Sequence, residues 1–314
     1  MADRKIIGIG ETVLDIVFRD DRPTAAVPGG STFNALISLG RTVRRHFTGV
    51  PVLMVTETGD DHVGDIVTSF MEENGVDTSA VTRNPGSQTH ISLAFLDSRN
   101  DAQYEFYKDH AHASLRQDRL AGLSFAKDDL VIFGSYFAIN PKIRPYTSAL
   151  IKQAHDAGAV IYYDVNFRRN HLSDLDETFR NIEENCRLST FVRGSEEDFG
   201  FLFGTRDPEE IYARHISPLC SNFICTCGAN PVHVFTPGRH MTYPVEPVET
   251  VSTIGAGDNF NAGFIFSLLS DGIGSDSAGA ISDRQWDSIV RTAGRFSSAV
   301  CKSIYNYVDP DFEI

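Results

Sequence analysis

The clearest chemical signal in the sequence lies in Thr253 to Gly263, which reads Thr-Ile-Gly-Ala-Gly-Asp-Asn-Phe-Asn-Ala-Gly. Gly255 and Gly257 let backbone N–H groups turn toward a ligand, and the apolar spacing that follows predicts a helix. The first N–H groups of a helix and the positive end of its dipole bind anions such as phosphate. Asp258 places a carboxylate at the mouth of that site. A simpler interpretation, a capped helix start, stays open at this point.

A second glycine-rich segment lies much earlier, at Pro28 to Ala35, which reads Pro-Gly-Gly-Ser-Thr-Phe-Asn-Ala. Gly29 and Gly30 allow a close approach of the backbone just before a helix that we expect over Ser31 to Arg44. Asn34 offers hydrogen-bond donors and acceptors one turn into that helix, which suits the recognition of hydroxyl groups. A tight turn followed by a helix cap is the alternative, and this segment taken by itself favours that alternative.

The elements that must position these segments alternate between strands and helices along most of the chain. Apolar and β-branched runs predict strands at Ile6 to Gly10, Pro51 to Thr56, Leu130 to Phe133, Ala159 to Asp164, Phe191 to Arg193 and Phe223 to Cys227. Helical patterns lie between them: one capped by Asp60 or Asp61 that ends at Gly75, then Ile143 to Ala157, Asp174 to Asn185 and Glu196 to Phe203. This alternation predicts an α/β fold with a mostly parallel sheet covered on both faces.

One region departs from the alternation. Thr89 to Leu96 and Gln103 to Tyr107 predict two strands joined by a turn-prone segment, with no helix between them. Val13 to Phe18 could pair with them. The antiparallel pair is either a flap added to the core or an ordinary sheet edge, and the pattern alone does not separate the two.

The composition excludes several classes of partner. The chain has 314 residues, of which 41% are hydrophobic and 22% charged, as in ordinary globular proteins. Its net charge of −14 repels nucleic acid and anionic lipid, so we expect no nucleic-acid or membrane partner. Five cysteines, an odd count, favour a reducing compartment. The charged first twenty residues and the lack of a run of ~20 apolar residues predict a cytoplasmic protein.

Further segments share their residue types and order with one known family. They are Gly10-Glu11 followed by Asp15, Gly59 to Gly64 with Gly75 to Thr78, Asp164 to Arg168, Arg193 to Asp198, and Thr226 to Ala229. Together with the two glycine-rich segments, they resemble the signature segments of the ribokinase-like (PfkB) carbohydrate kinase family, and in particular its fructokinase-type members. The resemblance extends over nearly the whole chain.

This resemblance implies a ribokinase-like three-layer α/β/α core with a mostly parallel sheet, as a single domain over residues 1–314. A small β-sheet lid, formed by about residues 12–28 and 88–112, would cover the sugar site and exclude water, which prevents wasteful hydrolysis of ATP. A homodimer could form through that lid. The implied activity is transfer of the γ-phosphate of ATP to a primary hydroxyl of a small sugar, and fructose is our first candidate.

The resemblance also implies roles for individual residues. Asp258 would be the base that accepts the hydroxyl proton, and the N–H groups of Gly255, Ala256 and Gly257 would form the anion hole. The substrate would bind to Asp15, Gly29, Gly30, Asn34 and Arg168. The nucleotide would bind to Asn166, Ser195, Thr226, Gly228, Gly255 and Gly257. Magnesium would enter with ATP, and Asp198 would contact it through water.

The sequence departs from the family pattern at three places. Ser252 stands where many members have an aspartate that helps to hold a monovalent cation, which puts potassium dependence in doubt. Ile254 replaces a threonine and removes one hydroxyl from the loop without touching the glycines. Ser195 and Asp198 stand where many members have asparagine and glutamate near the magnesium shell, so they would need water to reach it.

Several alternatives stay open at the level of sequence. The acceptor could instead be ribose, a 2-keto-3-deoxy sugar acid or a nucleoside; a sugar acid would need an arginine such as Arg168 or Arg99. A different class of protein, a non-catalytic sugar- or nucleotide-binding regulator on the same fold, is kept open by Ser252 and Ile254, whereas the retained Asp258 and the intact Gly255-Ala256-Gly257 count against it. A nicotinamide oxidoreductase is disfavoured, because the Gly8-x-Gly10 segment lacks the third glycine of a dinucleotide fingerprint.

Three other motifs could be functional but have plainer explanations. Cys225 and Cys227 share one face of a strand without a second pair at metal-binding spacing, so we interpret them as core residues. His110 and His112 lie at the end of the expected lid and lack nearby metal-binding partners in sequence. A basic group, Arg41, Arg44, Arg45 and His46, is interpreted as a helix C-terminus that complements the helix dipole.

Overall fold

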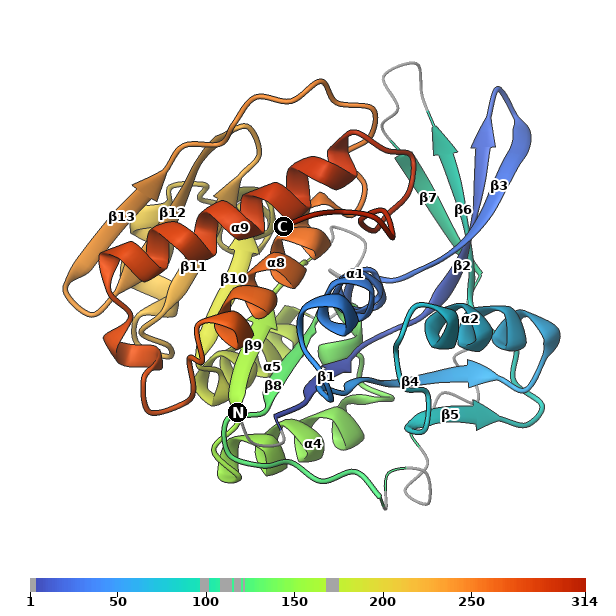
Figure 1. Ribbon diagram of the computed structural model, residues 1–314, viewed down its shortest axis with the longest axis horizontal. Coiled ribbons are helices and arrows are strands. Elements are labelled where there is room, and N and C mark those ends of the chain that lie inside the picture. Colours follow the sequence, from blue (N-terminus) through green and yellow to red (C-terminus); the bar gives the residue numbers. More distant parts are fainter. Residues whose placement is uncertain (1–3, 97–101, 108–114, 116–119, 121, 168–174) are drawn as a thin grey trace.

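The computed structural model describes residues 4–96, 102–107, 115, 120, 122–167 and 175–314. The expectations for Arg168, Arg99, His110 and His112 lie outside these residues, as does the end of the expected lid after residue 107. The described strands form two sheets, which we call the large sheet and the small sheet (Figure 1).

The large sheet has a parallel body and one antiparallel end. Its strands are β1 (Ile6–Ile9), β4 (Val52–Gly59), β5 (Val81–Asn84), β8 (Leu130–Gly134), β9 (Val160–Asp164), β10 (Phe191–Ser195), β11 (Phe223–Cys227), β12 (Asn230–Thr236) and β13 (Arg239–Tyr243). They lie in the order β13-β12-β11-β10-β9-β8-β1-β4-β5. Neighbours pair in parallel except at β11–β12 and β12–β13. The predicted mostly parallel sheet is confirmed, whereas β5, β12 and β13 were not predicted.

Helices cover both faces of the large sheet. One face carries α1 (Ser31–His46), α2 (His62–Glu73), α8 (Ala256–Ser270) and α9 (Asp283–Cys301); the other carries α4 (Arg144–Asp156), α5 (Leu175–Leu188), α6 (Glu196–Phe203) and the short α7 (Pro208–Ile211). Single turns lie at Tyr136–Ala138, Tyr212–Ile216 and Ala278–Ala280.

Alternate side chains along the strands of the large sheet belong to two separate hydrophobic clusters, one on each face of the sheet. On β8, Leu130 belongs to the cluster beneath α1, α8 and α9, and Val131 belongs to the cluster beneath α4, α5 and α6. On β9, Tyr162 and Tyr163 divide in the same way. This period of two on a sheet that is buried on both faces gives the three-layer α/β/α architecture that the resemblance implies.

Helix α8 is more deeply enclosed than its sequence pattern predicts. The spacing of Phe260, Phe264 and Leu268 predicts one buried stripe, but every residue from Asn259 to Leu269 is buried. The reason is that α8 packs against both α1 and α9 (Figure 1). Its first turn is therefore held by packing on several sides.

The small sheet stands beside the large one rather than continuing its edge (Figure 1). It contains β2 (Val13–Arg19), β3 (Arg22–Gly29), β6 (Ile91–Leu96) and β7 (Ala102–Tyr107), in the order β3-β2-β6-β7. β6 and β7 are antiparallel, as predicted, and β2 pairs with β6 in parallel. Asp20 and Asp21, with φ of 51° and 58°, form the two-residue turn between β2 and β3, a conformation that matches the twist of a hairpin. The structure thus favours the flap over the sheet edge.

Among the described residues, no helix is both long enough and apolar enough to span a membrane.

Candidate active site

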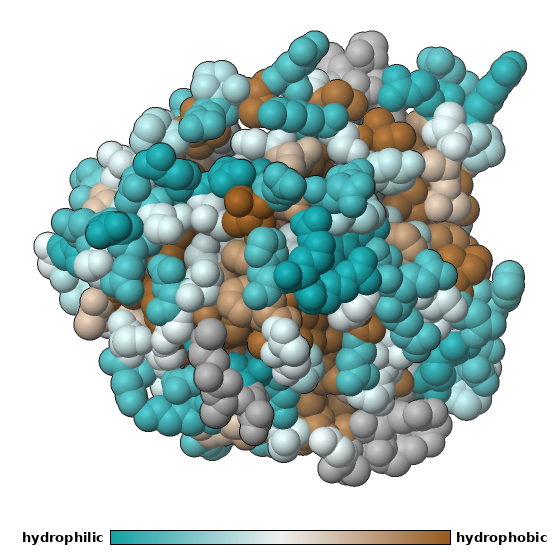
Figure 2. Space-filling model, viewed as in Figure 1, coloured by the Kyte–Doolittle hydropathy of each residue, from teal (hydrophilic) through white to brown (hydrophobic). Residues whose placement is uncertain are grey.

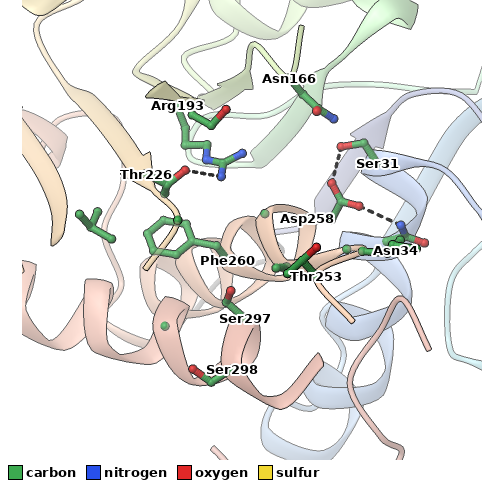
Figure 3. Close-up of a pocket in the computed structure, with 18 of the residues that line it drawn as sticks. Ser31, Asn34, Asn166, Arg193, Thr226, Thr253, Asp258, Phe260, Ser297 and Ser298 are labelled. Carbon is green, nitrogen blue, oxygen red and sulfur yellow. Dashed lines mark hydrogen bonds between the residues drawn. The ribbon is translucent and has the colours of Figure 1, made fainter. Parts of the chain in front are cut away.

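A cavity of about 1670 Å³ opens at the carboxyl ends of the central strands, the edge at which open parallel sheets bind ligands. The N-termini of α1 and α8 and one side of α9 also line it (Figure 3). Most of the site residues expected from the sequence line this cavity: Asp15, Gly30, Asn34, Asn166, Ser195, Asp198, Thr226, Gly228, Gly255, Ala256, Gly257 and Asp258. Arg168 lies outside the described residues.

The two glycines at the start of α8 are required for different reasons. Gly255 has a φ of +76°, and a Cβ there would lie 2.7 Å from the carbonyl oxygen of Asn306. A Cβ on Gly257 would lie 3.0 Å from the Nη1 and Nη2 atoms of Arg193. The first glycine therefore permits a left-handed turn against the C-terminal segment, and the second leaves room for a guanidinium. α8 has no side-chain cap, so its first N–H groups are those that an anion would use.

The side chain of Asn259 holds the turn at Gly255 in place. Its Nδ2 donates to the carbonyl oxygens of Gly255 and Asn306, each at 2.8 Å, and its Oδ1 accepts from Ser38 Oγ at 2.5 Å. The same Ser38 hydroxyl accepts from the backbone N–H of Val308 at 3.1 Å. Asn259 itself is fully buried. Asn259 thus ties the anion site to α1 and to the C-terminal segment, a positioning role that the sequence analysis missed.

The Asp258 carboxylate joins the two glycine-rich segments. Its Oδ1 accepts from Ser31 Oγ at 2.7 Å and its Oδ2 accepts from Asn34 Nδ2 at 2.8 Å (Figure 3). These residues come from the first turns of α1 and α8, more than two hundred positions apart in sequence. Asn34 is buried, and its Oδ1 has no hydrogen-bond partner among the described residues. A carboxylate, an amide and a hydroxyl therefore meet beside the first turn of α8.

The other end of the cavity is built around Asp15 on β2. Its carboxylate accepts a hydrogen bond from Ser92 Oγ on β6. A Cβ on Gly29 would lie 2.4 Å from Asp15 Oδ2, and one on Gly30 would lie 2.2 Å from the carbonyl oxygen of Glu11. The glycine pair is needed because the Asp15 carboxylate and the Glu11 backbone occupy that space. Gly29 does not itself line the cavity.

Two residues at the carboxyl ends of strands have unusual backbone conformations. Ser135, after β8, has a φ of 57° and Asn166, after β9, has a φ of 35°, values that non-glycine residues seldom adopt. Both line the cavity. Backbone strain of this kind concentrates at functional sites, because the surrounding structure must hold it in place.

Arg193 is a buried cation of the site, to which the sequence analysis gave no role of its own. Nη1 donates to Asp164 Oδ1 at 3.0 Å, and Nη2 donates to Thr226 Oγ1 at 2.6 Å. Asp164 also accepts from Asn261 Nδ2 at 2.6 Å. Burial acts to lower the pKa of Arg193, but the Asp164 carboxylate outweighs it and raises that pKa. The guanidinium is therefore a permanent positive charge between the strand ends and the first turn of α8.

Ser195 and Asp198 have a structural role in α6. Ser195 Oγ accepts from the Asp198 N–H at 3.1 Å, and Asp198 Oδ2 accepts from the Ser195 N–H at 2.7 Å. This reciprocal pair is a capping box. Both residues also line the cavity. Thr226, on β11, lines it as well, and so does Gly228, which turns the chain after β11 with a φ of +60°.

The remaining motifs have structural explanations. Ser252 Oγ accepts from the backbone N–H of Ile254 at 3.2 Å. Cys225 and Cys227 are buried on β11, in agreement with their interpretation as core residues. Among the described residues, no group of His, Cys, Asp or Glu is arranged to hold a metal ion.

The basic group on α1 matches its interpretation at Arg44, Arg45 and His46, which lie in the last turn of the helix, but not at Arg41. Its expected role was to complement the helix dipole, but Arg41 is buried and donates to Asn74 Oδ1 and to the carbonyl oxygen of Val308, each at 2.6 Å. It also lies over the Tyr307 ring, 4.8 Å from the centroid. Arg41 therefore anchors the C-terminal segment rather than only ending a helix.

Fold and site together define a class of protein. A cavity in which a helix N-terminus without a side-chain cap meets a carboxylate, an amide and a hydroxyl suits the transfer of a phosphoryl group to an alcohol. Residues 3–305 match the pfkB family carbohydrate kinases. A fructokinase from Rhizobium leguminosarum bv. trifolii is 30% identical over 277 residues, or 85% of this chain and 81% of that protein. A probable fructokinase-2 from Arabidopsis thaliana is 23% identical over 275 residues, or 85% and 82%.

Solved structures share the fold. A double-mutant fructokinase from Vibrio cholerae O395, bound to fructose, ADP and a potassium ion, superposes with a TM-score of 0.82 at 22% identity, covering 98% of this chain and 95% of that one. An aminoimidazole riboside kinase from Salmonella enterica, complexed with aminoimidazole riboside and an ATP analogue, gives 0.81 at 20% identity, with 98% and 97% covered. The chain belongs to the pfkB family of carbohydrate kinases, has the ribokinase-like fold and is an ATP-dependent sugar kinase.

Proposed function

We propose that the protein transfers the γ-phosphoryl group of ATP to a primary hydroxyl of a small sugar, and that fructose is the first substrate to test. The observation that carries this proposal is the position of the Asp258 carboxylate, on the first turn of α8 and hydrogen-bonded to Ser31 and Asn34. The fructokinase relatives support fructose. Ribose, a 2-keto-3-deoxy sugar acid and a nucleoside are the alternatives.

In this proposal the residues divide between two reactants. Asp15, Gly29, Gly30, Asn34 and Arg168 bind the acceptor; Asn166, Ser195, Thr226 and Gly228 bind the nucleotide. Asp258 takes the proton of the attacking hydroxyl, and the N–H groups of Gly255, Ala256 and Gly257 stabilise the charge that develops on the transferred group. Such a transfer depends on positioning and charge neutralisation, which fixed N–H groups and Arg193 supply without rearrangement.

Magnesium is the proposed divalent ion, since ATP carries it into kinase sites. When bound, magnesium would neutralise part of the phosphate charge. Asp198 lines the cavity and would contact it through water, because its Oδ2 already accepts from the Ser195 N–H. A carboxylate is the oxygen ligand that such hard cations prefer. A potassium requirement is not proposed, because the Ser252 hydroxyl is already used by Ile254.

We treat the chain as one domain in which the small sheet is the lid over the acceptor. A homodimer through this lid is supported by an apolar groove between β3, α2 and the C-terminal segment, lined by Val27, Pro28, Ile66, Phe70 and Tyr305. Figure 2 shows hydrophobic side chains gathered there, beside the small sheet. Light scattering would detect the dimer. The five cysteines are all unpaired, which supports the cytoplasm as the compartment.

The test is an ADP-release assay with ATP and magnesium over a panel of sugars, sugar acids and nucleosides. The proposal expects the highest kcat/KM for fructose. A sugar acid or nucleoside with the highest value would replace fructose as the substrate, and ADP release that no acceptor stimulates would refute the proposal.

A further inference from the structure

Ser31, the first residue of α1, lines the cavity, and the sequence analysis gave it no chemical role. Its Oγ donates to Asp258 Oδ1 at 2.7 Å, while Asn34 Nδ2 donates to Asp258 Oδ2 at 2.8 Å (Figure 3). α1 begins after Gly30 without a side-chain cap. The Ser31 hydroxyl therefore does not cap its own helix but reaches across to the first turn of α8.

The two helices joined by this contact are held at a fixed separation. α1 packs against α8 and is buried over most of its length. A Cβ on Gly10 would lie 2.5 Å from the Cβ of Thr32, so the first turn of α1 lies directly against the chain that follows β1. Two turns further along α1, Ser38 Oγ donates to Asn259 Oδ1 at 2.5 Å. Packing thus sets the start of α1 against α8, and the loss of one hydroxyl there should leave the fold intact.

The two donors reach different oxygens of one carboxylate, and this arrangement fixes its rotation. A carboxylate held by one donor turns about its Cβ–Cγ bond more easily than one held at both oxygens. A general base must present an oxygen within hydrogen-bond reach of the proton that it removes, and neighbouring hydrogen bonds hold such a group in the productive geometry. Hydrogen bonds to an ionised group are also the stronger kind.

The two donors differ in what they can do once the base has taken a proton. An amide N–H only donates, so Asn34 Nδ2 suits an oxygen that stays unprotonated. A hydroxyl both donates and accepts, so Ser31 keeps a hydrogen bond to Asp258 Oδ1 whether or not that oxygen carries a proton. The pair of donors therefore suits both protonation states of the carboxyl group.

We propose that Ser31 is a positioning residue for phosphoryl transfer: its hydroxyl holds Asp258 Oδ1 toward the acceptor and stays bonded to that oxygen as it takes the proton. This inference rests on the proposed function, in which Asp258 is the base. In the transfer, the acceptor oxygen bonds to the γ-phosphorus, the bond from that phosphorus to ADP breaks, and the proton of the acceptor hydroxyl goes to Oδ1. Ser31 acts on the rate of this step and not on the binding of either reactant.

The first test compares Ser31→Ala with the wild-type enzyme, using magnesium, ATP and the acceptor of highest kcat/KM in the panel. We expect kcat to fall about tenfold, the scale of a lost hydrogen bond to a charged group, with the KM values for acceptor and ATP nearly unchanged. Ser31→Thr keeps the hydroxyl and should keep most of the wild-type kcat. Ser148→Ala is the matched control, because Ser148 Oγ donates to Glu184 Oε1 at 3.4 Å on the α4 side and does not line the cavity.

A double-mutant cycle separates positioning from a structural effect. If Ser31 acts through the carboxylate, Ser31→Ala should lower the kcat of Asp258→Asn by less than about twofold, because the base is already lost. A loss of about tenfold in both backgrounds would show that Ser31 acts independently of Asp258, and would overturn the proposal.

The remaining results separate this inference from the proposed function. A raised KM for the acceptor at unchanged kcat would make Ser31 an acceptor ligand and overturn its positioning role. Wild-type kcat in Ser31→Ala would overturn that role as well, while the sugar kinase function would stand. A wild-type enzyme that phosphorylates no acceptor would overturn the proposed function and this inference with it.

Discussion

The two ends of the cavity are built in contrasting ways. The anion site at the start of α8 rests on buried groups: Asn259 holds the turn and Arg193 backs the first helical residues. The acceptor end lies where the small sheet meets the core, and its groups, such as Asp15 and Glu11, come from β2 and the loop before it. Strands β8 and β9 are buried along their whole length, whereas β3 begins with exposed residues.

The proposed function assigns different work to the two ends of the cavity. Phosphoryl transfer needs donors fixed before the reaction, because reorganisation during it costs rate. Acceptor binding instead needs a surface that can admit a sugar and then exclude water. In the proposed function, the core would meet the first requirement and the small sheet the second. Substitutions at the two ends should therefore separate into effects on stability and turnover, and effects on acceptor affinity.

The largest effect should follow from breaking the buried ion pair at the anion site. Arg193→Leu leaves the Asp164 carboxylate buried without its partner, and such a loss costs about 3–5 kcal/mol of the free energy of unfolding. Urea denaturation would measure it. Asp164→Asn in the same chain should recover part of the loss, because it removes the uncompensated charge. Equal stability of Arg193→Leu and the wild type would show that the pair is not a support of the core.

The second largest effect should follow from removing the proposed base, Asp258. Asp258→Asn is nearly isosteric, so the fold and the affinity for ATP should persist while kcat falls by ~100-fold or more. Steady-state kinetics at saturating ATP and sugar, with ATP binding measured by calorimetry, would check both parts. Wild-type turnover in this variant would exclude Asp258 as the base.

At the acceptor end the effect should lie in affinity. Asp15→Ala and Asn34→Ala each remove a proposed partner of a sugar hydroxyl and should cost ~1–3 kcal/mol of sugar binding, with the larger loss for the charged Asp15. The KM for ATP should change much less. Equal losses for ATP and for sugar would assign these residues to the fold or to the nucleotide end instead.

The hydrogen bonds of Asp61 to Gly64 and Thr89 should contribute a smaller, pH-dependent amount to the free energy of unfolding. Asp61 caps α2 through the Gly64 N–H at 2.8 Å and binds Thr89. Burial acts to raise the pKa of Asp61, but the bonds from Thr89 and Gly64 and the charge of Arg83 outweigh it, so this pKa lies below its ordinary value of 3.8. The folded state therefore gains stability from the ionised form above that value and loses it as the pH falls through the lowered pKa. Asp61→Ala should cost ~1 kcal/mol at pH 7.

Thermal denaturation from pH 7 to pH 3 would follow the difference in stability between Asp61→Ala and the wild type. It should shrink steadily below about pH 4. A difference that stays constant over this range would mean that the charge of Asp61 is unimportant.

The smallest effect should come from potassium. Ser252 offers one neutral hydroxyl that already accepts from Ile254, and hard cations prefer charged oxygen ligands. We expect turnover to be nearly equal in potassium and in a bulky organic cation at matched ionic strength, with magnesium present. A several-fold stimulation by potassium would show that backbone carbonyls alone build a cation site.

The sequence predicts the regular core and the two signature segments well, because both depend on local signals. Glycines before helices mark Gly29 and Gly255, and short runs of apolar and β-branched residues mark the buried strands. The supports of the site are not predicted, since they depend on long-range contacts. Nothing near Asn259 reveals that it binds the backbone of Asn306, and nothing near Arg41 reveals its contact with Val308. Glu11 and His90 also meet only after the small sheet has formed.

The central claim is that this cavity moves a phosphoryl group from ATP to a sugar hydroxyl, and phosphorus NMR of the reaction products tests it most directly. The wild-type enzyme, incubated with ATP, magnesium and fructose, should produce ADP and a sugar phosphomonoester in equal amounts, with the phosphate on a primary carbon. Asp258→Asn should form that product ~100-fold more slowly or worse. ADP accompanied only by inorganic phosphate, or a phosphomonoester formed equally fast by the variant, would contradict the account.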